Sequence, residues 1–169
     1  MIDRFIQGFR GFLKWLGPFQ TSILIILIVL FLWTKTIGYL GVNTDVSLPY
    51  KLFYVNKLDK GPFKQGDIVT FNFWGSDYYE EGFKMVKIVK CSSGSYLEVI
   101  DKDFYCDGVY LGRAKDKDRY GKQVYNFYYD GVIPEGYYFV MGTHPDSYDS
   151  RYYGLLWKGY IVGKAYPLF

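Results

Sequence analysis

The sequence predicts a mainly β domain attached to a single N-terminal transmembrane helix. Two features predict this fold class: a long uncharged apolar run near the N-terminus, and short strand-like runs separated by turns after residue 40. The 19 Gly and the 22% aromatic content agree with the second feature, because aromatic residues favour strands and glycine favours turns. With 169 residues, the chain has room for one domain of ordinary size.

The apolar run extends from Pro18 to Thr34 and contains no charged residue. It lies near the lower end of the roughly 17–25 residues that cross a membrane, and because Lys35 can snorkel, the span could extend to Leu40. A buried core helix is the alternative, but one this apolar would need cover on every side. A cleaved signal peptide is another, yet the run is longer than a usual h-region and no convincing cleavage site follows. We expect an uncleaved anchor over residues 17–40.

The residues that flank this run predict its orientation. Three basic residues precede it: Arg4, Arg10 and Lys14. Only Lys35 follows closely, so the positive-inside rule places the N-terminus in the cytoplasm and residues 41–169 outside it.

Apolar residues also recur at helical spacing before the run: Ile2, Phe5, Ile6, Phe9, Phe12, Leu13 and Leu16. Residues 1–16 are therefore expected to form an amphipathic segment on the inner leaflet.

Beyond residue 40, five runs are typical of strands: Leu52–Val55, Asp67–Phe73, Phe83–Val89, Tyr96–Ile100 and Tyr137–Val140. Turn signals such as Asp107-Gly108 and Asp130-Gly131 separate or flank them, and no long amphipathic helix pattern competes. We therefore expect a sandwich or barrel-like sheet over residues 41–169. Residues from about 91 to 131 are expected to form an inserted, lid-like excursion, with Arg113–Lys122 as its solvated loop.

Cys91 and Cys106 both lie in the outer part of the chain. If that part faces an oxidising compartment, they could form a disulfide, which would contribute about 3 kcal/mol for a loop of roughly 15 residues. Two buried thiols are the alternative. Neither cysteine is expected to be catalytic.

The composition excludes much of the usual catalytic chemistry. One His and two Cys cannot form a multi-histidine or a four-cysteine metal site, so we expect no metal and no cofactor. A net charge of +3 is too slight to imply a nucleic-acid partner.

A serine triad would have to use His144, which we expect to be a loop residue. A hydroxyl nucleophile therefore needs another base, and a neutral lysine is the main candidate.

Lys87 is the lysine that best fits this requirement. Strand alternation places four residues on one face: Phe83, Met85, Lys87 and Val89. Lys84 and Lys90 lie on the opposite face, where they can reach water. A general-base lysine must be desolvated, because its ordinary pKa is near 10.4. An edge lysine that snorkels into water is the alternative.

Four short blocks resemble, in order, those of the type I signal peptidases: Asn43–Pro49, Gly66–Val69, Met85–Val89 and Gly142–Gly154. In this resemblance Ser47 matches the nucleophile and Lys87 the general base. It implies a signal-peptidase-like β-barrel or sandwich catalytic domain and a serine endopeptidase with an acyl-enzyme mechanism. It also implies that Asp149, Ser150 and Arg151 support the site.

The short length, Asn43, the run DSRYYG and the ending IVGKAYPL resemble the TraF-type branch of conjugative transfer. This resemblance implies a bacterial inner-membrane enzyme with a periplasmic catalytic domain. The implied substrate is a membrane-embedded pilin precursor for type IV secretion, which some members join into a circle. A general leader peptidase acting on exported preproteins is the alternative, and a non-catalytic membrane-anchored assembly factor is the second.

Asp45 departs from this branch, which usually has a small hydroxyl residue two positions before the serine. Its negative charge would oppose an oxyanion, so Thr44 or backbone N–H groups would have to serve instead. Lys51 also replaces a common glycine, and Cys91–Gly94 replaces the turn that usually follows the lysine block. These departures predict altered specificity with the Ser47/Lys87 pair retained.

Overall fold

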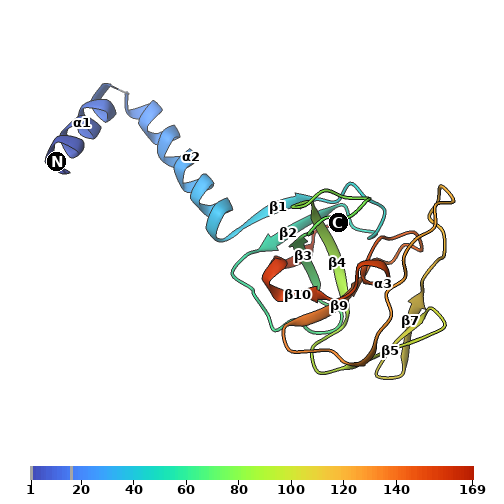
Figure 1. Cartoon of the computed structure of the whole chain (residues 1–169). Helices are drawn as coiled ribbons and strands as arrows, with labels where there is room; N and C mark the ends of the chain where they lie inside the picture. The colour runs from blue at the N-terminus through green and yellow to red at the C-terminus, as the bar shows by residue number, and fades with distance from the viewer. Residues whose placement is uncertain (1, 16) are drawn as a thin grey trace. The chain divides into compact units, whose positions relative to one another are not determined.

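Figure 1 shows the computed structural model of the protein, which describes residues 2–15 and 17–169. The chain divides into two compact units, one ending at Tyr39 and the other running from Leu40 to Phe169. Helices α1 (Ile2–Trp15) and α2 (Pro18–Thr36) belong to the first unit. Leu16, the last residue of the expected amphipathic pattern, lies outside the described residues, as do the side chains of Ile2, Phe5 and Leu13.

Helix α2 is long and apolar enough to cross a membrane, with a mean hydropathy of 1.8 and no buried side chain. It begins at Pro18, whose fixed φ and missing N–H suit the first helical position. The helix ends at Thr36, and the N–H of Ile37 bonds the carbonyl of Trp33 at 2.8 Å. A strand begins at Gly38, so the helix does not continue to Leu40.

The second unit is built on a seven-stranded sheet in the order β1-β2-β11-β3-β4-β9-β10. Its strands are β1 (Gly38–Val42), β2 (Leu52–Asn56), β3 (Ile68–Asn72), β4 (Lys84–Cys91), β9 (Tyr137–Met141), β10 (Leu156–Trp157) and β11 (Ile161–Pro167). The neighbours from β2 to β10 pair antiparallel. Two short helical turns, α3 (Ser150–Tyr153) and η1 (Lys158–Tyr160), flank β10 in sequence.

The expected excursion forms a second sheet of four strands, in the order β7-β6-β5-β8. They are β5 (Tyr96–Ile100), β6 (Asp103–Cys106), β7 (Val109–Arg113) and β8 (Asp130–Val132). Cys91, at the end of β4, forms a disulfide with Cys106 of β6, with Cα atoms 5.7 Å apart. The disulfide therefore links the two sheets covalently.

Strand β9 contributes side chains to both hydrophobic cores. Tyr138 and Val140 belong to a cluster with β3 and β4, whereas Phe139 and Met141 belong to a cluster with β5 and β6. Because side chains alternate along a strand, both faces of β9 are covered. This fits the continuous apolar run of the strand.

The mainly β fold is confirmed, and its sheets do not close into a barrel. The five predicted strand runs correspond to β2, β3, β4, β5 and β9, within two residues at either end. Phe83 is the exception to the predicted face of β4, because it lies outside the strand and is 47% exposed. The buried face begins instead at Met85 and continues through Lys87 and Val89.

Candidate active site

Ser47 lies in the turn between β1 and β2 and is 2% exposed. The side chain of Asn43 holds this turn, because its amide donates to the carbonyls of Leu48 at 3.4 Å and Tyr50 at 3.1 Å. The N–H of Asn43 also bonds the carbonyl of Lys51 at 2.8 Å. Asn43, which precedes the predicted nucleophile, thus bonds to the carbonyls of residues that follow it and holds the two ends of the turn together.

The loop after β9 also binds this turn. The N–H of Thr143 donates to the carbonyl of Ser47 at 2.7 Å, and its hydroxyl donates to the same oxygen at 3.3 Å. Gly142 makes this approach possible: a Cβ there would lie 2.7 Å from the Ser47 carbonyl oxygen and 2.3 Å from Ser147 Oγ. Both distances are too short for any side chain, so the contact requires glycine.

Lys87 occupies the buried face of β4, where it pairs with Val69 of β3 and is only 3% exposed. Its Nζ donates to Ser147 Oγ at 2.9 Å. Burial lowers the pKa of Lys87 below the ordinary lysine value, although Asp149 and Asp45 act in the opposite direction. The snorkelling alternative is thereby excluded, because the amine lies inside the domain. A lysine in this environment loses its proton more readily than one in water.

Asp149 and Arg151 form a buried ion pair next to Ser147. The Asp149 carboxylate accepts from Arg151 Nε at 2.8 Å and Nη2 at 2.9 Å, and from the N–H of Gly142 at 3.0 Å. Arg151 Nη2 also donates to the carbonyl of Ser147 at 3.2 Å. Burial opposes the Arg151 cation, but the hydrogen bond and charge of Asp149 hold its pKa above the usual value. The pair thus fixes Gly142 and Ser147, which contact Ser47 and Lys87.

The site residues predicted from the sequence do not include Ser147, which makes the hydrogen bond to Lys87. They include Ser150, whose hydroxyl accepts the N–H of Val140 at 2.9 Å and so supports β9. The available signal was the alternation Ser147, Asp149, Arg151 within the last block, which carries polar groups at every second residue. Residues 147, 149 and 151 are all buried.

His144 lies in the same loop, as expected from the sequence. Its Nδ1 accepts the N–H of Asp146 at 3.1 Å. Asp45 is exposed, and its carboxylate accepts the N–H of Val46 at 2.7 Å. Within residues 2–15 and 17–169, no three His, Cys, Asp or Glu residues gather as a metal site would require.

The family model described as signal peptidase, peptidase S26, matches residues 12–169. The conjugal transfer protein TraF of Agrobacterium fabrum is 29% identical over 150 residues, which cover 79% of this chain and 84% of the relative. Signal peptidase I of Aquifex aeolicus is 51% identical over 39 residues, covering 22% of this chain and 15% of that protein.

Among solved structures, signal peptidase I from Enterococcus faecalis aligns at 24% identity with a TM-score of 0.41, covering 62% of this chain and 97% of that one. The match of the family model extends over both the apolar helix and the whole outer unit. The resemblance seen in the sequence blocks is thereby confirmed, and the chain belongs to the signal peptidase family, peptidase S26.

Proposed function

We propose that this protein is a membrane-anchored serine endopeptidase in which Ser47 is the nucleophile and Lys87 the general base. The observation that carries the proposal is the environment of Lys87: an amine 3% exposed, bonded to Ser147 and lowered in pKa by burial. The buried Ser47 turn meets the same Gly142–Ser147 segment. A hydroxyl nucleophile needs such a base, because it is weak at its own pKa.

The reaction follows from these two groups. Neutral Lys87 accepts the hydroxyl proton as Ser47 Oγ attacks the scissile carbonyl. When the C–N bond breaks, the ammonium returns that proton to the leaving amine, and an acyl ester remains on Ser47. Lys87 then accepts a proton from water as the water oxygen attacks the ester, and its ammonium returns that proton to Ser47 Oγ as the ester C–O bond breaks. If an amine of the substrate is held at high effective concentration, it can replace water and close a ring.

Ser147, Asp149 and Arg151 act as positioning residues in this scheme. Ser147 fixes the amine of Lys87, and the buried ion pair fixes Ser147 through its carbonyl. Such a chain of contacts lowers the number of orientations that the lysine can adopt. Pre-organisation of this kind accounts for a large share of the rate gained when reacting groups are held together.

For the substrate, we propose a membrane-embedded pilin precursor of conjugative type IV secretion. The TraF relative, matched over 84% of its length, supports this choice. The short segment shared with a signal peptidase I at 51% identity supports the second candidate, a general leader peptidase of exported preproteins. Three basic residues before α2 support a cytoplasmic N-terminus in the bacterial inner membrane, with the catalytic unit in the periplasm.

Mass spectrometry of a co-expressed candidate pilin tests the proposal. The wild-type protein should remove the prepeptide, and a further loss of one water mass would identify ring closure. Ser47→Ala and Lys87→Met should leave the precursor intact, whereas Lys84→Met, an exposed lysine on the same strand, should process it normally. Full maturation by Ser47→Ala would refute the peptidase and favour a non-catalytic assembly factor. An intact pilin beside cleaved exported precursors would favour the general leader peptidase.

A further inference from the structure

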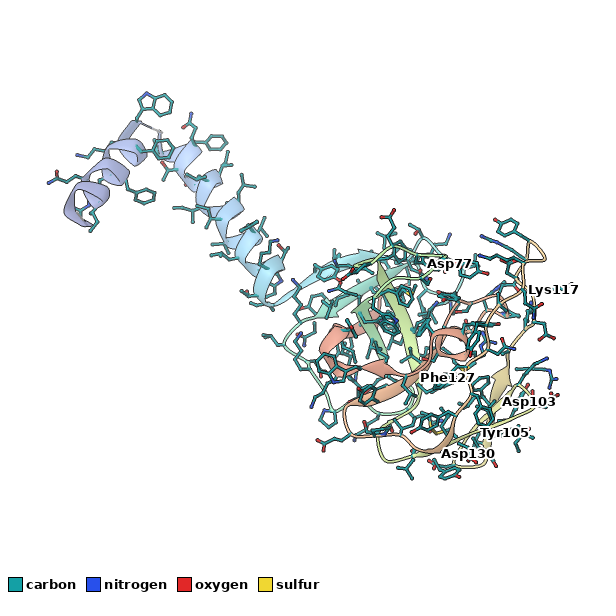
Figure 2. The ribbon with its side chains drawn as sticks, in the orientation of Figure 1. Asp77, Asp103, Tyr105, Lys117, Phe127 and Asp130 are labelled. Atoms are coloured by element: carbon teal, nitrogen blue, oxygen red, sulfur yellow. A yellow bond between two sulfur atoms is a disulfide. The ribbon has the colours of Figure 1, made fainter. Side chains whose placement is uncertain are left out.

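A cavity of about 390 Å³ opens beside the nucleophile turn. Four segments line it: Asp45 and Val46 before Ser47, the loop between β3 and β4, the loop between β7 and β8, and the segment after β9. Figure 2 labels Asp77 in the loop between β3 and β4, and Lys117 in the loop between β7 and β8. Cavities of this size bind small ligands and side chains of peptides. Neither the predicted dyad nor the buried ion pair lines it.

Tyrosine rings form one wall of the cavity. Tyr148 stacks on Tyr152 with ring centres 5.8 Å apart and an angle of 8°. Tyr79 lies 5.7 Å from Tyr148 at 29°, and Tyr78 lies 5.1 Å from the same ring. Rings that contact one another in this way form an aromatic wall whose geometry is already fixed. Such a surface fits an aromatic side chain, which loses little further entropy on binding.

Most charged groups around the cavity already have partners. Lys115 pairs with Asp146, and Lys122 lies 3.4 Å from Asp77. In the loop between β7 and β8, Asp118 accepts from the Tyr78 hydroxyl at 3.1 Å and from two backbone N–H groups, and Asp116 pairs with Lys102. These acids are therefore satisfied within the protein.

Two cations at the rim differ from the rest. Lys117 and Arg119 form no salt bridge with any described carboxylate of residues 40–169, although Lys115 and Lys122 beside them do. The Arg119 guanidinium lies 5.0 Å from the Tyr120 ring instead. The lining also carries the exposed carboxylate of Asp45, two residues before Ser47. The cavity thus offers two cations without a salt bridge in the loop between β7 and β8, and one exposed carboxylate in the nucleophile turn.

We propose that this cavity binds a segment of the peptide substrate in which an aromatic side chain is accompanied by a carboxylate. The ring would lie on the tyrosine wall, and the carboxylate would face Lys117 and Arg119. Asp45 disfavours a carboxylate placed beside the nucleophile turn. The inference deepens the proposed function, on which it rests, by assigning substrate selection to a loop that lies outside the Ser47, Lys87 and Ser147 constellation.

Direct binding to the full-length Ser47→Ala protein in a neutral detergent tests this, because no turnover occurs. The probes are N-acetyl-L-phenylalanine, its primary amide, and N-acetylglycine. Ligand-observed NMR titration measures the dissociation constant of each. The free acid should bind about fivefold more tightly than the amide, as two exposed cations together would provide. N-acetylglycine, which lacks the ring, should bind more weakly than the aromatic acid.

Two double variants identify the cations responsible. Lys117→Ala/Arg119→Ala should abolish the preference for the acid while still binding the amide. The matched control, Lys84→Ala/Lys90→Ala on β4, should keep the preference. Equal affinity for acid and amide, or a preference that persists without Lys117 and Arg119, would overturn the inference. Because cleavage is measured separately on the pilin, these outcomes leave the assignment of Ser47 and Lys87 intact.

Discussion

Replacing Gly142 with alanine should disable the site while leaving most of the fold in place. The new Cβ would lie 2.3 Å from Ser147 Oγ, 2.7 Å from Ser147 Cβ and 2.7 Å from the Ser47 carbonyl oxygen. Non-bonded atoms sit comfortably at about 3.5 Å, so relief requires displacements of roughly 1 Å. Two of the three atoms belong to the residue that holds Lys87, and the third belongs to Ser47 itself. The substitution therefore displaces the backbone of the predicted nucleophile and the residue that positions its base.

A misplacement of about 1 Å costs roughly 100-fold in rate, so kcat/KM for precursor cleavage should fall by about that factor. An overpacked core costs about 1–3 kcal/mol, which should appear as a lower midpoint in urea unfolding. Gly11→Ala in α1 is the matched control, since a Cβ there meets nothing within 4 Å and Gly11 is exposed. Wild-type kcat/KM together with an unchanged unfolding midpoint for Gly142→Ala would refute the reasoning.

Three further predictions concern the buried charges and the disulfide. Cys91→Ala/Cys106→Ala should lower the free energy of unfolding by about 3 kcal/mol, and reductant should shift the wild type but not the variant. Asp149→Asn leaves Arg151 buried without its counter-ion and should cost about 3–5 kcal/mol, measured by urea titration against Asp77→Asn, an exposed pair. Because burial lowers the folded pKa of Lys87, the unfolded chain binds more protons between the two pKa values, so wild-type stability rises with pH there. Lys87→Met should lack that rise in thermal unfolding followed up to the ordinary lysine pKa, and the same rise in Lys87→Met would contradict the assignment.

Local patterns in the sequence were sufficient to predict where Lys87 lies. Its neighbours at 85 and 89 are apolar, strand alternation places all three on one face, and that face is buried. The same reasoning predicts β9, whose continuous apolar run reflects two covered faces. Both inferences depend on residues within one strand, where periodicity carries the information.

Contacts between distant segments could not be predicted in this way. The bond from Lys87 to Ser147 joins residues 60 positions apart, and no local period marks Ser147 as its partner. Strand β11 shows the same limit, because Gly163 breaks its apolar pattern. A Cβ at that position would lie 2.0 Å from the Asn56 carbonyl oxygen, so the glycine reflects a close approach to the neighbouring chain segment. Such requirements become visible only when the partner strand is known.

Strand β11 joins the two parts of the sheet that carry the predicted nucleophile and the predicted base. Ser47 belongs to the turn before β2, and Lys87 to β4, while β11 lies between β2 and β3. Residues 161–167 are synthesised after all the other strands, and domains acquire their structure as the chain emerges. A chain interrupted before Ile161 therefore lacks the strand that joins the serine half of the sheet to the lysine half. We therefore expect a chain that ends before β11 to lack the proposed proteolytic activity.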